Sequence, residues 1–136
     1  MKKILLLLFI STNFIYSQIQ EVTNNKNPQI KIGEAKDVSL VHNTDMGQYN
    51  FTYFDARYKK LMEITTFSFE KESDLDVLYD ALINAQFKEF KIHEGTLYIE
   101  NKKGKVRMSF SEVDHIKSSA PTEWLKPEDV KQLFGK

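Results

Sequence analysis

The sequence predicts an α+β fold, with one antiparallel sheet of about five or six strands and two helices. Three observations support this class. Apolar and polar side chains alternate along several short segments, the apolar spacing changes to the helical period in two places, and turn-forming residues separate the segments. The expected element order is β-β-β-α-β-β-β-α. This order repeats one topological pattern twice, although the residues of the two halves do not repeat.

The chain begins with the features of a secretory signal peptide. Lys2 and Lys3 make a positive start, residues 4–10 form an unbroken apolar run, and the small residue Ser17 precedes Gln18. The apolar run is too short for a membrane span, which needs ~20 apolar residues. We therefore expect cleavage after Ser17 and export to the periplasm or the extracellular space, with no transmembrane anchor.

The expected domain organisation follows from this start. Residues 1–17 are the signal peptide, and the polar residues 18–29 are a mobile N-terminal lead-in. Residues 30–136 form a single α+β domain, because a mature chain of ~120 residues is long enough to bury one core.

Three strands are expected before the first helix. Residues 30–42 have extended character that is interrupted at Gly33. Residues 49–57 alternate with period two, and residues 62–69 are rich in β-branched and aromatic side chains. Only a polar tip at residues 58–60 separates the last two strands, so we expect them to form a hairpin.

The first helix is expected after Ser73, which is a good N-cap residue, and should end near Ala85. Leu75, Leu78 and Leu82 follow Ser73 at helical spacing. Three further strands are then expected at residues 87–93, 96–100 and 105–110.

The C-terminal segment is expected to hold a second helix. Residues 112–121 are polar and predict a loop, and Pro127 suits the first position of a helix. Because this helix is short, it must be held by docking, with Trp124 as its anchor. The residues expected to be buried with it are Leu125, Val130, Leu133 and Phe134.

The composition narrows the function classes. Lys and Arg number 19 and Asp and Glu number 19, so removing Lys2 and Lys3 leaves a slightly acidic mature chain. Such a chain has no global field that would attract nucleic acid, which is therefore an unlikely partner. The absence of cysteine excludes disulfides, thiolate metal sites and cysteine nucleophiles.

The sequence assigns no catalytic residue, metal ligand or cofactor. The three histidines, His42, His93 and His115, do not pair at metal-ligand spacing. The acids between Glu70 and Asp80 suit a helix start, where the dipole favours negative charge. No nucleophile elbow, phosphate-binding glycine loop or dinucleotide fingerprint occurs.

Basic residues gather at two expected hairpin tips. If the tips are neighbours, they form a basic edge beside an aromatic ring that suits an anionic polymer such as a sulfated glycan. The alternative is that they are ordinary solvated turns, where lysines also prevent unwanted strand pairing. The candidate ligand-binding residues are Arg57, Tyr58, Lys59, Lys60, Lys102 and Lys103, with Lys105 and Arg107 following the second tip.

Four segments of the chain resemble small secreted proteins of flavobacterial (Bacteroidetes) type. They are Ile32–Leu40, Tyr49–Tyr58, Phe67–Phe69 and the tail Leu133–Lys136 that follows Trp124-Leu125. The resemblance implies an exported single domain. It rests on strand and turn patterns, so it carries over no catalytic or binding residue.

Two functions remain open from the sequence. The first is a non-enzymatic binding or interaction module, whose partner is an envelope protein or an anionic glycan. The second is a small secreted hydrolase that uses His93 or His115 with an acid from the segment between Glu70 and Asp76. A concave pocket that joins a histidine to a carboxylate would favour the hydrolase, and exposed aromatic residues on a flat or convex sheet would favour the binding module.

Overall fold

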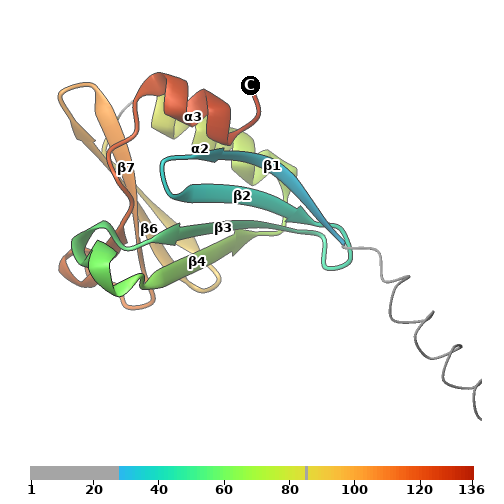
Figure 1. Cartoon of the computed structure of the whole chain (residues 1–136), viewed down its shortest axis with the longest axis horizontal. Coiled ribbons are helices and arrows are strands. Elements are labelled where there is room, and N and C mark those ends of the chain that lie inside the picture. Colours follow the sequence, from blue (N-terminus) through green and yellow to red (C-terminus); the bar gives the residue numbers. More distant parts are fainter. Residues whose placement is uncertain (1–27, 85) are drawn as a thin grey trace, which may run out of the picture.

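The computed structural model describes residues 28–84 and 86–136, which fold into two antiparallel sheets of four strands and their helices (Figure 1). Sheet A contains β1 (Gln29–Ala35), β2 (Val38–Asn43), β3 (Gln48–Phe54) and β4 (Ile64–Phe69). Sheet B contains β5 (Lys88–Ile92), β6 (Gly95–Lys102), β7 (Lys105–Ser111) and β8 (Ala120–Pro121). The α-helices are α2 (Glu72–Ile83) and α3 (Pro127–Leu133), and the short 3₁₀ helices are η1 (Ala56–Leu61) and η2 (Ile116–Ser118).

The α+β class is confirmed, but the expectation of one sheet with five or six strands is wrong. Each half of the chain is a four-strand meander followed by a helix. Residues 30–42 are two strands because the chain reverses between Ala35 and Val38, where Lys36 adopts a left-handed φ of 49°. The segment 112–121 holds β8, whose two residues carry too little pattern to be seen in the sequence.

One core joins the two sheets and the two helices. Its largest fully buried side chains come from both sheets and from the C-terminal segment. Phe51 and Phe67 of sheet A stack with ring centroids 5.0 Å apart, and Phe67 stacks in turn on Phe110 of sheet B at 5.5 Å. Each of these rings stabilises the fold, because its burial removes a large apolar area from water and because the ring pairs have favourable geometry.

Tyr53 connects the two sheets by hydrogen bonds as well as by packing. Its hydroxyl accepts from the Phe110 N–H at 3.2 Å and donates to the Ala120 carbonyl at 2.5 Å. The side chain of a β3 residue therefore satisfies backbone groups of β7 and β8. Burial raises the pKa of Tyr53, so its hydroxyl stays protonated and remains able to donate.

Helix α3 packs on sheet A, although it follows sheet B in the sequence. Figure 1 shows it lying over β1 with α2 beside it. A Cβ atom at Gly33 would overlap the carbonyl oxygens of Gln132 and Leu133, so only glycine allows this approach. The side-chain amide of Gln132 also donates to the Glu34 carbonyl at 2.8 Å.

The prediction for the C-terminal segment is confirmed except at Trp124. Leu125, Val130, Leu133 and Phe134 are buried, and Pro127 begins α3 as expected. Trp124 is only half-buried. Its ring centroid lies 4.6 Å from the guanidinium carbon of Arg107. Leu125 is fully buried and pairs with Val106 of β7, so it is the anchor of the segment.

The start of α2 differs from the expectation, whereas its end lies near Ala85 as expected. The N-cap residue of α2 is Lys71 rather than Ser73, and the first turn is closed by the Asp74 N–H, which donates to the Lys71 carbonyl at 3.1 Å. The helix ends at Ile83 and Asn84 caps it. The expected polar tip at residues 58–60 is part of η1.

The predicted signal peptide and almost all of the lead-in lie outside the described residues. Within the described part, no helix is long and apolar enough to cross a membrane.

Candidate functional site

A groove of about 360 Å³ lies between β4, α2 and β5. Residues from the end of β4, from α2 and from β5 with the turn that follows it form its walls. Its apolar floor and walls consist of Phe69, Val77, Leu78, Phe90 and Ile92. A volume in this range matches small ligand pockets, and it suits one large apolar group.

The rim of the groove is acidic. Glu70, Asp74 and Glu94 line it together with Lys71 and Lys91. Lys91 forms ion pairs with Asp114 and Glu89, and its hydrogen bond to Asp114 is the main reason that its pKa is raised. Lys91 is thus paired with acids that do not line the groove, and Lys71 is the other cation among the lining residues that the structure describes.

Glu94 is held in place at the boundary of the two sheets. Its carboxylate accepts a hydrogen bond from the Ser68 backbone N–H at 2.9 Å, which joins the β5–β6 turn to the edge of β4. The next residue, Gly95, leaves no room for a Cβ atom beside the Ser111 carbonyl, so the turn is tightly seated. The fold therefore fixes the position of Glu94 on the acidic rim.

His93 lies on the same rim as three carboxylates, so the groove meets one condition set for the hydrolase hypothesis. Acid–base catalysis by a histidine also requires an acid that orients it and a nucleophile close to it. Among the residues that the structure describes, no hydrogen bond or ion pair joins His93 to a carboxylate or hydroxyl. The other histidine of that hypothesis, His115, accepts from the Lys117 N–H at 3.1 Å and caps η2.

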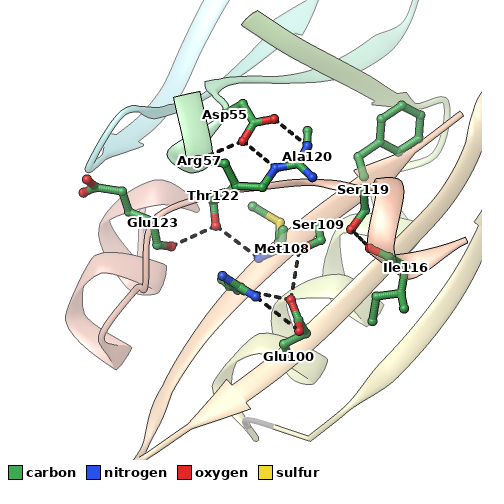
Figure 2. Close-up of polar contacts among 12 residues, drawn as sticks. Asp55, Arg57, Glu100, Met108, Ser109, Ile116, Ser119, Ala120, Thr122 and Glu123 are labelled. Atoms are coloured by element: carbon green, nitrogen blue, oxygen red, sulfur yellow. Dashed lines mark hydrogen bonds and ion pairs between the residues drawn. The ribbon is translucent and has the colours of Figure 1, made fainter. Parts of the chain in front are cut away.

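The two predicted basic tips share a hollow through their arginines. Arg57 and Arg107 line a second hollow of about 440 Å³, together with Thr122, Glu123 and Trp124. Figure 2 shows the polar contacts around it. Lys102 and Lys103 lie at the β6–β7 turn, outside this lining.

Both arginines are already paired with carboxylates. Arg57 contacts Asp55 through Nε at 3.1 Å and Nη2 at 2.8 Å, and Arg107 contacts Glu100 through Nε at 2.7 Å (Figure 2). Burial alone would raise the pKa of Asp55, but its bonds to Arg57 outweigh burial and lower it. The hydrogen bond from Arg107 likewise lowers the pKa of Glu100.

The lysines of the first tip divide into paired and unpaired side chains. Lys59 forms ion pairs with Glu123 and Asp37, and its hydrogen bond to Glu123 is the first cause of its raised pKa. Lys60 is exposed and makes no ion pair with any described residue. Tyr58 is exposed, and its ring centroid lies 5.2 Å from the guanidinium carbon of Arg57.

The groove was not predicted from the sequence. Its walls come from three elements that are separate in the chain, and Ser68 and Glu94 are 26 residues apart. One local signal was present: Val77 is an apolar residue on the otherwise charged outer face of α2, where it is exposed.

No group of three or more metal-ligating side chains occurs in residues 28–84 and 86–136. Comparison of the chain with protein-family models, curated proteins and solved structures finds no match.

Proposed function

We propose that this chain is an exported, non-enzymatic binding module and that the groove between β4, α2 and β5 is its binding site. The observation that carries the proposal is the combination of an apolar floor with an acidic rim held by the Ser68–Glu94 hydrogen bond. The groove takes an apolar group of its ligand, and the rim favours a cationic group next to it.

The polar part of the site supports binding rather than covalent chemistry. A catalytic histidine needs an orienting partner and a nearby nucleophile or water. Among the described side chains, no hydrogen bond or ion pair joins His93 to a partner of either type. The absence of sequence motifs for hydrolysis agrees with this assignment.

The proposal is tested with the neutral apolar fluorophore N-phenyl-1-naphthylamine. Its fluorescence should rise and saturate with the wild-type protein at low protein concentration. Val77→Trp fills the groove from an exposed helix position, so it should abolish saturable binding. Val113→Trp adds the same side chain at another exposed valine and should leave binding unchanged.

Equal probe binding by the wild type and by Val77→Trp would show that the groove is not the binding site. Circular dichroism of all three proteins checks that neither substitution disturbs the fold.

One observation favours hydrolysis as a second candidate function: His93 and three carboxylates share the groove rim. His93→Ala would then abolish turnover of a chromogenic ester, and His115→Ala would serve as the matched control. We expect both variants and the wild type to give only the background rate, in agreement with a binding module.

A further inference from the structure

The outer strands of the two sheets differ in how their free edges are protected. Sheet A ends in β1 and β4, and sheet B ends in β5 and β8. A free edge is a template for pairing with another chain, so proteins protect edges with charges, proline, bulges or a covering element.

Three of these edges are protected. β1 has a register shift next to Lys31 and is covered by α3, whose Gln132 donates to the Glu34 carbonyl. β5 has the sequence Lys-Glu-Phe-Lys-Ile, which places charged side chains along the strand. β8 is two residues long and ends in Pro121, which has no backbone N–H.

The edge of β4 has no such protection at Ile64 and Thr66, although Glu94 covers its end at Ser68. Ile64–Phe69 contains no charged residue, glycine or proline, and its register with β3 is unbroken. Ile64 and Thr66 are exposed. A β-prone, uncharged segment on an open edge has the properties of a pairing strand.

The hydrogen bonds around β4 show which backbone groups point outward. The Glu63 carbonyl accepts from Asp55 next to β3, so the odd-numbered residues of β4 face the sheet. The Ser68 N–H instead donates to Glu94, so the even-numbered residues face the free edge. The backbone groups of Ile64 and Thr66 are therefore directed toward a further strand.

An exposed apolar cluster adjoins this edge. We call Tyr58–Met62 the η1 tip. Tyr58, Leu61, Met62 and the first β4 residue, Ile64, are 47%, 68%, 66% and 65% exposed. Met62 also has a left-handed φ of 52°, which is uncommon for a non-glycine residue. Apolar side chains gathered in this way mark a surface for interaction.

We propose that the partner of this edge is a second copy of the chain. Two β4 strands pair antiparallel about Thr65, and the η1 tip of each copy occupies the groove of the other. The inference rests on the proposed function, because it names the occupant of the same groove.

The register of such a pair is self-consistent. Antiparallel pairing about Thr65 sets Ile64 of each copy opposite Thr66 of the other, so the outward backbone groups meet. The Ser68 N–H can remain bonded to the Glu94 carboxylate, because the pairing of Ile64 with Thr66 does not use it. The η1 tip of one copy then lies at the end of β4 where the groove of the other copy opens.

The tip and the groove are complementary in chemistry. Leu61 and Met62 are apolar and exposed, and the groove has an apolar floor. Lys60 has no acidic partner within its own described chain, and the rim of the groove presents Glu70, Asp74 and Glu94. A two-fold axis makes each of these contacts twice.

Sedimentation equilibrium of the purified exported protein tests the proposal. The wild type should show a concentration-dependent monomer–dimer equilibrium. Thr66→Lys places a charge on the exposed face of the edge strand and should leave only monomer. Lys60→Glu and Glu70→Lys should each weaken the dimer by about tenfold, because each reverses a charge at two symmetric contacts.

The charge-swapped double variant Lys60→Glu/Glu70→Lys should regain most of the wild-type affinity. Lys102→Glu makes the same charge change at the other hairpin and should dimerise normally. A protein that is monomeric at every soluble concentration, a dimer that survives Thr66→Lys, or a double variant without rescue would each overturn the inference. Saturable fluorophore binding by a monomeric wild type would leave the groove as a binding site and remove only the second copy as its occupant.

Discussion

Tyr53 carries a polar link through the middle of an apolar core. Its hydroxyl satisfies the Phe110 N–H and the Ala120 carbonyl at the same time. Removing the hydroxyl leaves these two backbone groups buried without this partner. The free-energy cost of an unsatisfied buried group exceeds the net contribution of a typical hydrogen bond to stability.

Tyr53→Phe should therefore lower the free energy of unfolding by about 1–3 kcal/mol. Urea denaturation monitored by circular dichroism measures the change. Tyr49→Phe is the matched control, since Tyr49 is half-buried, stacks on His42 and makes no hydroxyl hydrogen bond among the described residues. Equal midpoints for the two variants would show that the hydroxyl of Tyr53 adds nothing to stability.

Asp55 should make stability depend on acid pH. Its side chain is buried and accepts three hydrogen bonds from Arg57, which hold its pKa below the ordinary value in the folded state. A carboxyl with a depressed folded pKa stabilises the protein above the unfolded pKa, and this contribution is lost as pH falls through the folded pKa.

The urea midpoint of the wild type should accordingly fall more steeply below about pH 4 than that of Asp55→Asn. Asp45→Asn, in an exposed turn, should follow the wild type. Parallel pH profiles for the wild type and Asp55→Asn would contradict the assignment of this acid dependence to Asp55.

At the scale of elements, the C-terminal segment is held by its leucine rather than by its tryptophan. Leu125 is fully buried and exchanges two backbone hydrogen bonds with Val106, at 2.6 and 2.9 Å. Trp124 is half-buried, and its ring packs against the Arg107 guanidinium. The two neighbours therefore contribute differently to the free energy of unfolding.

Leu125→Ala should lower the free energy of unfolding by ~2–5 kcal/mol, the usual cost of a leucine cavity. Trp124→Ala should cost about 1 kcal/mol, since it removes a partly exposed cation–π contact. Thermal melts of both variants test the order. If Trp124→Ala were the more damaging change, tryptophan would be the anchor after all.

The basic tips should behave as solvated turns. Acidic partners neutralise three of the basic side chains, Arg57, Lys59 and Arg107. The remaining lysines at the two turns do not make a concentrated positive potential. The exported protein should elute in the void of a heparin column at low salt. Salt-sensitive retention that is lost in the Lys59, Lys60, Lys102 and Lys103 quadruple alanine variant would instead make these residues an anion site.

At the scale of the whole molecule, the proposed destination is outside the cytoplasm. Export with cleavage after Ser17 predicts a mature protein that begins at Gln18. N-terminal sequencing of protein recovered from the periplasm or medium measures this directly. Recovery of a chain that still begins at Met1 from those fractions would contradict the predicted cleavage.

The elements that the sequence predicts well are those with a local cause. The alternation before Phe54, the β-branched run of β4 and Pro127 at the start of α3 each act within a few residues. The division into two sheets is different, because β8 is specified by contacts with β7 and with Tyr53. The groove is also non-local, since Ser68 and Glu94 become neighbours only after α2 and β5 have folded.

The docking of α3 on β1 sets the order in which the fold can be completed. The Gln132–Glu34 hydrogen bond joins residues 98 positions apart, so sheet A receives its cover from a helix that leaves the ribosome after both sheets. Contacts of such long sequence separation slow folding, because the intervening chain must be closed before they form. A nascent chain truncated before α3 would thus keep β1 uncovered. If the protein is exported as a growing chain, its own topology delays complete folding until α3 has been translocated.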